Sequence, residues 1–168
     1  PYCTRCGIPF PDHHPDNHVC GSCLTSPMKI ETIRAACEYK GIIRQAVPLL
    51  KYQQRLSLIK VFERLLFQTF ITCFDPGSVD RIMPVPLHRS RLRERGFNQA
   101  FLLVRRFAKF HREQFGRPPE WDLDIETLTR QKKTPPQTGL DLAARTRNLK
   151  KAFIISDKAR IKDSSILL

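Results

Sequence analysis

Four cysteines near the start of the chain stand in two Cys-x-x-Cys pairs that thirteen residues separate: Cys3 with Cys6, and Cys20 with Cys23. Each pair can wrap a tight turn around a metal ion and present two thiolates, so together they form a ligand set for tetrahedral zinc. Four thiolates leave no open coordination position for water, and we therefore expect a structural rather than a catalytic zinc. Gly7 and Gly21, beside the thiols, are expected to supply permissive turn backbone. The pattern predicts a zinc ribbon over residues 1–28.

Other readings of the cysteines are weaker. The loop between the pairs holds three histidines that could replace a ligand, but with four cysteines available we expect them to be solvated: His13, His14 and His18. Disulfides are disfavoured in the cytoplasmic setting expected below. Redox catalysis by one pair lacks the strand–motif–helix context that it requires. Cys37 and Cys73 stand alone in apolar stretches and are expected to be buried.

A run of arginines is the second group of residues that could do chemistry: Arg89, Arg91, Arg93 and Arg95. The run forms an expected loop that leads through Gly96 into a helix. Guanidinium groups are planar and match phosphate oxygens, and a helix N-terminus adds free N–H groups for an anion. We expect this loop to bind phosphate or a polyanion, and the alternative is a solvated charged loop.

A second basic loop covers residues 130–139 and carries Lys132 and Lys133, and Arg145 follows it. Polar loops of this kind often close over ligands. These three residues complete the candidate set for binding phosphate or nucleic acid.

The elements that must position these residues alternate between strands and helices. We expect strands at residues 33–39, 79–85, 125–128, 152–155 and from 166 onward, and helices at 42–52, 56–70, 97–112 and 140–149. In the helix at 97–112, the basic residues are expected to lie outside. The alternation argues for an α/β layer with a parallel sheet. Since such sheets bind ligands at the carboxyl ends of their strands, the strand at 79–85 places the arginine loop at the binding edge.

Composition narrows the class of protein. The 168 residues suffice for one ordinary domain and a small appendage, and 41% apolar residues can build a core. The net charge of +13 is uneven, because residues 1–30 are neutral while residues 79–121 hold ten basic and four acidic side chains. Such a surface attracts polyanions, although a merely solvated surface is the alternative. The longest apolar run, 100–104, is too short to span a membrane, and no secretory leader is visible, so we expect a cytoplasmic protein.

Four stretches together resemble a known family. They are the paired Cys-x-x-Cys motifs, LLKY at 49–52, PVPLHRSRLRERGFNQA at 84–100, and R-x-x-x-T-x-x-Q…R-x-x-N-L-x-x-A-F at 130–153. In this order they are similar to the ComF family of competence-associated, phosphoribosyltransferase-like proteins, over essentially the whole chain. The resemblance implies a type I phosphoribosyltransferase-like fold at residues 29–168 behind the zinc ribbon. It also implies handling of single-stranded DNA during natural transformation, with a competence helicase or recombination proteins as expected partners.

The resemblance also implies an alternative function, Mg²⁺-dependent phosphoribosyl transfer from phosphoribosyl pyrophosphate. Pyrophosphate would then lie at the arginine loop, under a flap formed by residues 130–140. The family continues the strand begun at Ile166 into two acidic residues and a loop that holds the phosphate and ribose, and this sequence stops before them. We therefore expect the C-terminal part of the fold to be missing and the 168-residue chain to be inactive. Asp157 and Asp163 lie at the start of that strand, the wrong end for a ligand site.

Aromatic side chains could stack on nucleic-acid bases in the DNA-binding reading. The candidates are Tyr2, Phe10 and Phe97, each of which is more simply expected to be a core or staple residue.

Overall fold

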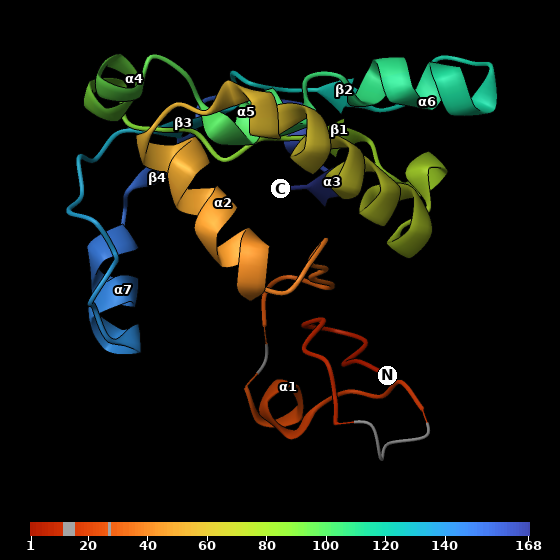
Figure 1. Ribbon diagram of the computed structural model, residues 1–168, viewed down its shortest axis with the longest axis horizontal. Coiled ribbons are helices and arrows are strands. Elements are labelled where there is room, and N and C mark those ends of the chain that lie inside the picture. The colour runs from red at the N-terminus through yellow and green to blue at the C-terminus, as the bar shows by residue number, and fades with distance from the viewer. Residues whose placement is uncertain (12–15, 27) are drawn as a thin grey trace. The chain divides into compact units, whose positions relative to one another are not determined.

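The computed structural model describes residues 1–11, 16–26 and 28–168, and the chain divides into two compact units, Pro1–Tyr39 and Lys40–Leu168 (Figure 1). Contacts group residues 29–39 with the N-terminal unit. His13 and His14 lie outside the described residues.

Among its described residues, the N-terminal unit has one short helix, α1 (Gly21–Thr25), and two isolated β-bridges. The strand predicted at 33–39 is wrong, because no residue from 31 to 40 belongs to a strand. Instead, Ile33 donates its N–H to the Arg5 carbonyl oxygen at 2.7 Å. The guanidinium of Arg34 donates to the Thr4 carbonyl oxygen at 2.9 Å. The segment therefore lies against the first cysteine turn. Cys37 is exposed, contrary to prediction.

The first two long helices of the C-terminal unit confirm the predicted helices at 42–52 and 56–70. Helix α2 (Gly41–Tyr52) continues through Pro48, and a 3₁₀ turn, η1 (Leu56–Leu58), precedes helix α3 (Ile59–Cys73). Helix α3 is buried on one face, while Val61 and Leu65 are exposed on another. A second 3₁₀ turn, η2 (Pro76–Ser78), follows at once.

The predicted parallel sheet is present. Strands β1 (Arg81–Ile82), β2 (Asp122–Leu123) and β5 (Ile166–Leu167) run parallel in the order β2-β1-β5. The α/β class is therefore confirmed. The strand predicted at 79–85 is cut to two residues, and Pro84 shortly after it has no N–H to donate to a neighbouring strand.

A turn replaces most of the strand predicted at 125–128. The Asp124 carboxylate accepts hydrogen bonds from the backbone N–H groups of Glu126 at 3.0 Å and Thr127 at 2.9 Å, and from the Thr127 hydroxyl at 2.6 Å. Burial raises the pKa of Asp124, but these hydrogen bonds outweigh it and hold the pKa below its ordinary value. The carboxylate thus reverses the chain directly after β2.

This turn is followed by a second sheet, and that sheet was not predicted from the sequence. Strand β3 (Leu128–Arg130) pairs antiparallel with β4 (Phe153–Ile155). Between them lie an irregular loop and helix α7 (Leu142–Leu149), close to the helix predicted at 140–149. A 3₁₀ turn, η3 (Ala159–Ile161), leads on toward β5, and Asp157 starts it by accepting from the Ala159 N–H at 2.9 Å.

The arginine run is a helix, α4 (Arg89–Arg95), and the predicted loop is wrong. The His88 ring accepts a hydrogen bond from the Ser90 N–H at 3.2 Å, which caps the N-terminus of the helix. Gly96 ends it in the left-handed conformation, at φ 78°.

The helix predicted at 97–112 is broken into α5 (Gln99–Val104) and α6 (Phe107–Phe115). At the break, Arg106 leaves helical geometry, with φ −102° and ψ 4°. Its guanidinium lies 2.6 Å from the carboxylate of Glu63 on α3. The Glu63 side chain is only 1% exposed. The prediction that Arg106 lies on the outside of a continuous helix is therefore wrong.

Aromatic side chains dominate the core of the C-terminal unit. They come from α3, from α6 and from the segment before β2, and they pack around β1. The members are Phe67, Phe70, Val79, Ile82, Phe107, Phe110 and Trp121. None of the described helices is both long enough and apolar enough to cross a membrane.

Candidate functional site

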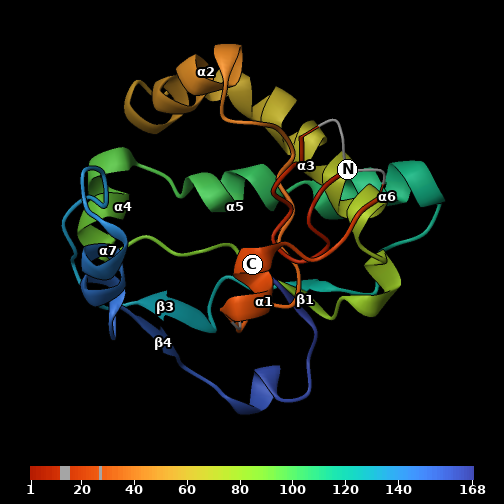
Figure 2. The same cartoon turned by 90° about the horizontal axis from the view of Figure 1, so that it is seen from below.

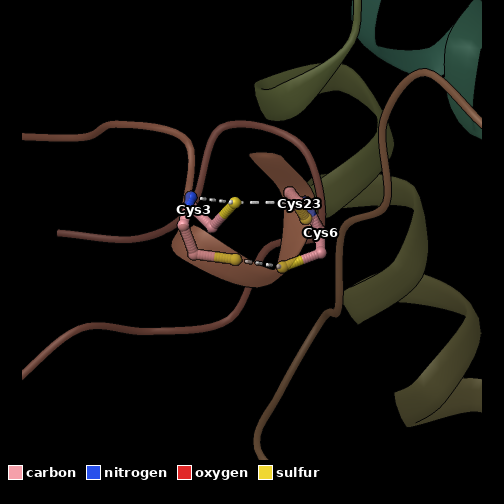
Figure 3. A group of neighbouring side chains, drawn as sticks. Cys3, Cys6 and Cys23 are labelled. Atoms are coloured by element: carbon pink, nitrogen blue, oxygen red, sulfur yellow. Dashed lines mark hydrogen bonds between the residues drawn. The ribbon is translucent and has the colours of Figure 1, made fainter. Parts of the chain in front are cut away.

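The four predicted zinc ligands come together in the N-terminal unit. The Sγ atoms of Cys3, Cys6, Cys20 and Cys23, the cysteine cluster, all lie within 4.8 Å of one another. Figure 3 shows three of these side chains pointing toward one another. In a tetrahedral site with metal–sulfur bonds of about 2.3 Å, neighbouring sulfur atoms lie about 3.8 Å apart. The Sγ atoms of Cys6 and Cys20 are 3.8 Å apart, so the cluster fits a zinc ion along this edge.

Backbone N–H groups make one sulfur of the cluster a good thiolate. The Cys3 Sγ accepts the N–H of Cys20 at 3.3 Å and that of Cys6 at 3.5 Å. Burial raises the pKa of Cys3, but the backbone donors outweigh it and lower the pKa to about 5. Burial and the neighbouring thiols instead raise the pKa of Cys23 to about 12. All six cysteines are free thiols, so the disulfide alternative is not realised in the structure.

Two other predictions about this module have different outcomes. Gly7 is required, because its φ is +72° and an added Cβ would lie 2.6 Å from the Ile33 carbonyl oxygen. Gly21 is the first residue of α1, has open space around it and needs no special conformation. His18 stacks its ring on Phe10, with centroids 4.2 Å apart, and lies outside the group of possible ligands found among the described residues.

The four arginines of α4 do not share one face. Arg89 and Arg93 are exposed, whereas Arg91 and Arg95, which are also four residues apart, are half-buried on the other side of the helix. The Arg91 guanidinium lies 3.5 Å from the Glu94 carboxylate. That of Arg95 donates to the Gln99 side-chain oxygen at 3.2 Å and lies over the ring of Tyr52.

Arg130, the last residue of β3, was not among the predicted site residues, although it opens the R-x-x-x-T motif. Its Nη2 donates to the buried Thr134 hydroxyl at 2.5 Å, and the guanidinium lies over the ring of Phe153. Its Nε is buried and donates to no acceptor in the described part of the chain. Burial, and then the positive charge of Arg91, lower the pKa of Arg130. We call Arg91 and Arg130 the guanidinium pair.

The second predicted loop is tied down by the other polar residues of its motif. Arg145 donates its Nε hydrogen to the Leu140 carbonyl oxygen at 2.9 Å, and the Asn148 side chain donates to that of Pro135 at 3.1 Å. Lys132 and Lys133 are exposed on this loop. Asn148 thus holds the loop itself, and one predicted binding residue, Arg145, holds the residue directly after it.

The guanidinium pair lies where a parallel sheet binds ligands. Helix α4 follows the carboxyl end of β1, and β3 follows that of β2, so both cations belong to the connections at this edge. In Figures 1 and 2, α4, β3, β4 and α7 lie on the same side of the C-terminal unit, with α6 on the other. Two cations of which one lowers the pKa of the other, with a buried donor that has no acceptor among the described residues, form a favourable setting for an anion.

The three aromatic candidates have different environments. Tyr2 lies under the guanidinium of Arg34, at 5.0 Å from the ring centroid, Phe10 stacks on His18, and Phe97 is half-buried. None of the three is a fully buried core residue.

Comparisons with known proteins bear on function. No family model and no solved structure matches the chain. The DNA utilization protein YhgH of Escherichia coli (strain K12) is 30% identical over 154 residues, 90% of this chain and 63% of that protein. Competence protein F of Haemophilus influenzae is 27% identical over 165 residues, 93% of this chain and 65% of that protein. Competence protein ComFC of Bacillus subtilis is 27% identical over 108 residues, 61% and 43% of the two chains. The chain thus spans less than two thirds of the length of these relatives.

Proposed function

We propose that this chain, which belongs to the ComF family of competence-associated proteins, binds single-stranded DNA during natural transformation. The phosphates would lie against α4 and the guanidinium pair. Relatives named for competence and for DNA utilization support the cellular role. We place the protein in the cytoplasm, where a competence helicase or recombination proteins are the expected partners.

The guanidinium pair is the observation that carries this proposal. The positive charges of Arg91 and Arg130 repel each other, since that of Arg91 lowers the pKa of Arg130, and the buried Nε of Arg130 makes no hydrogen bond with the described residues. A phosphate oxygen would accept from both groups and remove both costs. The competing explanation is that Arg130 only holds Thr134 and covers Phe153. Arg91, which does neither, distinguishes the two explanations.

The distribution of charge supports phosphate contacts rather than reading of bases. Residues 79–121 carry ten basic and four acidic side chains, and Lys132 and Lys133 lie exposed on the nearby motif loop. Contacts to phosphates provide affinity without sequence preference, and they weaken as salt rises. We therefore expect binding that is salt-dependent and largely independent of sequence.

Affinity for a labelled single-stranded oligonucleotide, measured by fluorescence anisotropy, tests the proposal. The α4 triple variant replaces three arginines by alanine: Arg91, Arg93 and Arg95. A control triple variant removes the same charge from α6 and the turn before it: Arg105, Lys109 and Arg112. The α4 triple should bind roughly 10- to 100-fold more weakly than wild type, and the control should change little. Equal losses of oligonucleotide affinity in the two variants would show that only net charge matters, and would refute a binding site at α4.

The cysteine cluster is proposed to hold one structural zinc ion, in a zinc ribbon at residues 1–28. Zinc would cross-link the two cysteine turns in a unit that offers few buried apolar side chains besides its thiols. With all four positions filled by thiolates, the ion would contribute stability and no catalytic chemistry.

A second candidate function is Mg²⁺-dependent phosphoribosyl transfer, on a type I phosphoribosyltransferase-like domain at residues 29–168. The observation that favours it is an anion setting at the carboxyl edge of a parallel sheet, beside a polar loop. Arg91, Arg130 and that loop would bind the pyrophosphate end of phosphoribosyl pyrophosphate, while Mg²⁺ would bridge its oxygens. We expect the 168-residue chain to bind this donor weakly and not to turn it over. Isothermal titration with the donor, and an assay for its turnover with purine and pyrimidine acceptors, test both expectations.

A further inference from the structure

The end of α2 and helix α4 enclose a small hollow that neither residue of the guanidinium pair lines. Its volume is about 100 Å³, and five residues line it: Lys51, Tyr52, Gln54, Glu94 and Arg95. The hollow therefore combines one aromatic ring, two cations, an amide and a carboxylate.

Tyr52 presents its ring to solvent rather than to the core. Helix α2 buries Ala46 and Leu50, which lie four residues apart on one face. Tyr52, two residues beyond Leu50, points away from that face and is 68% exposed. Core packing thus gives no reason for an aromatic residue at this position.

Arg95 holds one side of the ring. Its guanidinium carbon lies 5.6 Å from the centroid of the Tyr52 ring, within the range of a cation–π contact. The Gln99 side-chain oxygen accepts from the same guanidinium at 3.2 Å and fixes its position. The large exposed fraction of Tyr52 leaves ring surface open to a second flat group.

The hollow is also continuous with the cations of α4. Glu94, which lines the hollow, lies 3.5 Å from the Arg91 guanidinium, so one carboxylate links the hollow to the guanidinium pair. Glu94 and Gln54 add groups that can accept hydrogen bonds from the edge of a base. A strand whose phosphates lie along α4 could therefore turn one base into the hollow.

We infer that Tyr52 and Arg95 form a stacking site for one unpaired nucleobase. This inference rests on the proposed binding of single-stranded DNA and deepens it. A base in a duplex is paired and stacked on its neighbours, so its face is not accessible to the ring. The site thus selects single strands over double strands without reading sequence, since every base has a π face.

Two oligonucleotides of equal length and charge test the inference, one of thymidines and one of abasic residues. Wild type should bind the thymidine strand more tightly than the abasic strand. Tyr52→Ala should weaken binding of the thymidine strand by roughly five- to 150-fold, as expected for losing one stacked base, and should leave the abasic strand unchanged. Tyr52→Phe should behave as wild type. Tyr39→Ala, a change of a similarly exposed tyrosine in the other unit, is the matched control.

The outcomes separate the inference from the function on which it rests. If wild type binds neither strand, the proposed function fails and the stacking site with it. If wild type binds both strands equally, DNA binding stands and the stacking site is refuted. An equal loss on both strands in Tyr52→Ala also refutes it, because the ring would then support the fold. Urea unfolding of Tyr52→Ala identifies that last case independently.

Discussion

Replacing Arg91 by glutamine should separate anion binding from folding, because Arg91 has one attractive and one repulsive electrostatic interaction. Its guanidinium lies 3.5 Å from the exposed carboxylate of Glu94, and its charge lowers the pKa of Arg130. An exposed ion pair contributes about 0–1 kcal/mol, and repulsion between two partly exposed cations is of the same order. These contributions oppose each other. The free energy of unfolding of Arg91→Gln in anion-free buffer should therefore lie within about 1 kcal/mol of wild type.

Pyrophosphate binding should respond much more strongly to the same substitution. A hydrogen bond to a charged group contributes about 1.5–3 kcal/mol, so losing one should weaken pyrophosphate binding roughly 10- to 150-fold. At a pyrophosphate concentration of about 100 times its Kd, wild type gains about 2.7 kcal/mol of stability. At that same concentration, a variant with tenfold weaker binding gains only about 1.4 kcal/mol.

Urea unfolding followed by tryptophan fluorescence measures both quantities. Trp121 is the only tryptophan of the chain and is buried in the core of the C-terminal unit, so it reports on that unit. Arg105→Gln, a change at an exposed arginine between α5 and α6, is the control and should gain as much from pyrophosphate as wild type. The reasoning is refuted if Arg91→Gln loses more than about 2 kcal/mol in buffer and gains the wild-type amount from pyrophosphate.

Three further predictions concern the fold. Protein purified without chelator should carry one zinc ion per chain, and chelation should raise amide exchange in the N-terminal unit first; metal analysis that finds no zinc would contradict this. Gly7→Ala should destabilise the N-terminal unit by about 1–2 kcal/mol or more, because Gly7 has a φ of +72° and the new Cβ would lie 2.6 Å from a backbone oxygen. Gly21→Ala should not destabilise it. Equal zinc-release midpoints for the two variants would contradict this prediction. Arg106→Met should lower the free energy of unfolding in urea by about 3 kcal/mol, because it leaves the buried Glu63 carboxylate without its partner. Adding Glu63→Met should restore most of this stability. An Arg106→Met variant as stable as wild type would show that the pair is dispensable.

The cysteine cluster could be predicted because its geometry is local. Each Cys-x-x-Cys pair occupies one turn, and the conformation of Gly7 follows from that turn. The segment at 33–39 was predicted wrongly for the opposite reason. Its alternation of apolar residues resembles a strand, but a strand needs a partner, and the hydrogen bonds of Ile33 and Arg34 go to the cysteine turn instead.

Helix prediction succeeded where one amphipathic face decides and failed where a distant contact decides. Helices α2 and α7 follow their sequence patterns closely. The break between α5 and α6 depends on the pairing of Arg106 with Glu63, forty-three residues away, and no local pattern contains that information. Helix α4 could have been found, since arginine and leucine favour helices and both ends carry capping residues, His88 and Gly96.

The candidate site was predicted in part. The resemblance to the ComF family is confirmed by the relatives named Competence protein F and ComFC. The arginine run was identified, but not its division into two faces, which required the helix. Arg130 was identified only as part of a motif, because its electrostatic interaction with Arg91 depends on the β3–β4 pairing and on the placement of α4. Tyr52 was missed for the same reason, since Arg95 comes to it from another helix.

The salt dependence of single-stranded DNA binding tests the central claim most directly. For single strands, log K falls with log salt concentration by about 0.7 for each phosphate contact. Replacing Arg91, Arg93 and Arg95 by alanine should therefore flatten the slope by about 2 relative to wild type, while the control triple variant keeps the wild-type slope. A slope in the α4 triple that equals that of wild type would contradict the account, because it would mean that these arginines touch no phosphate.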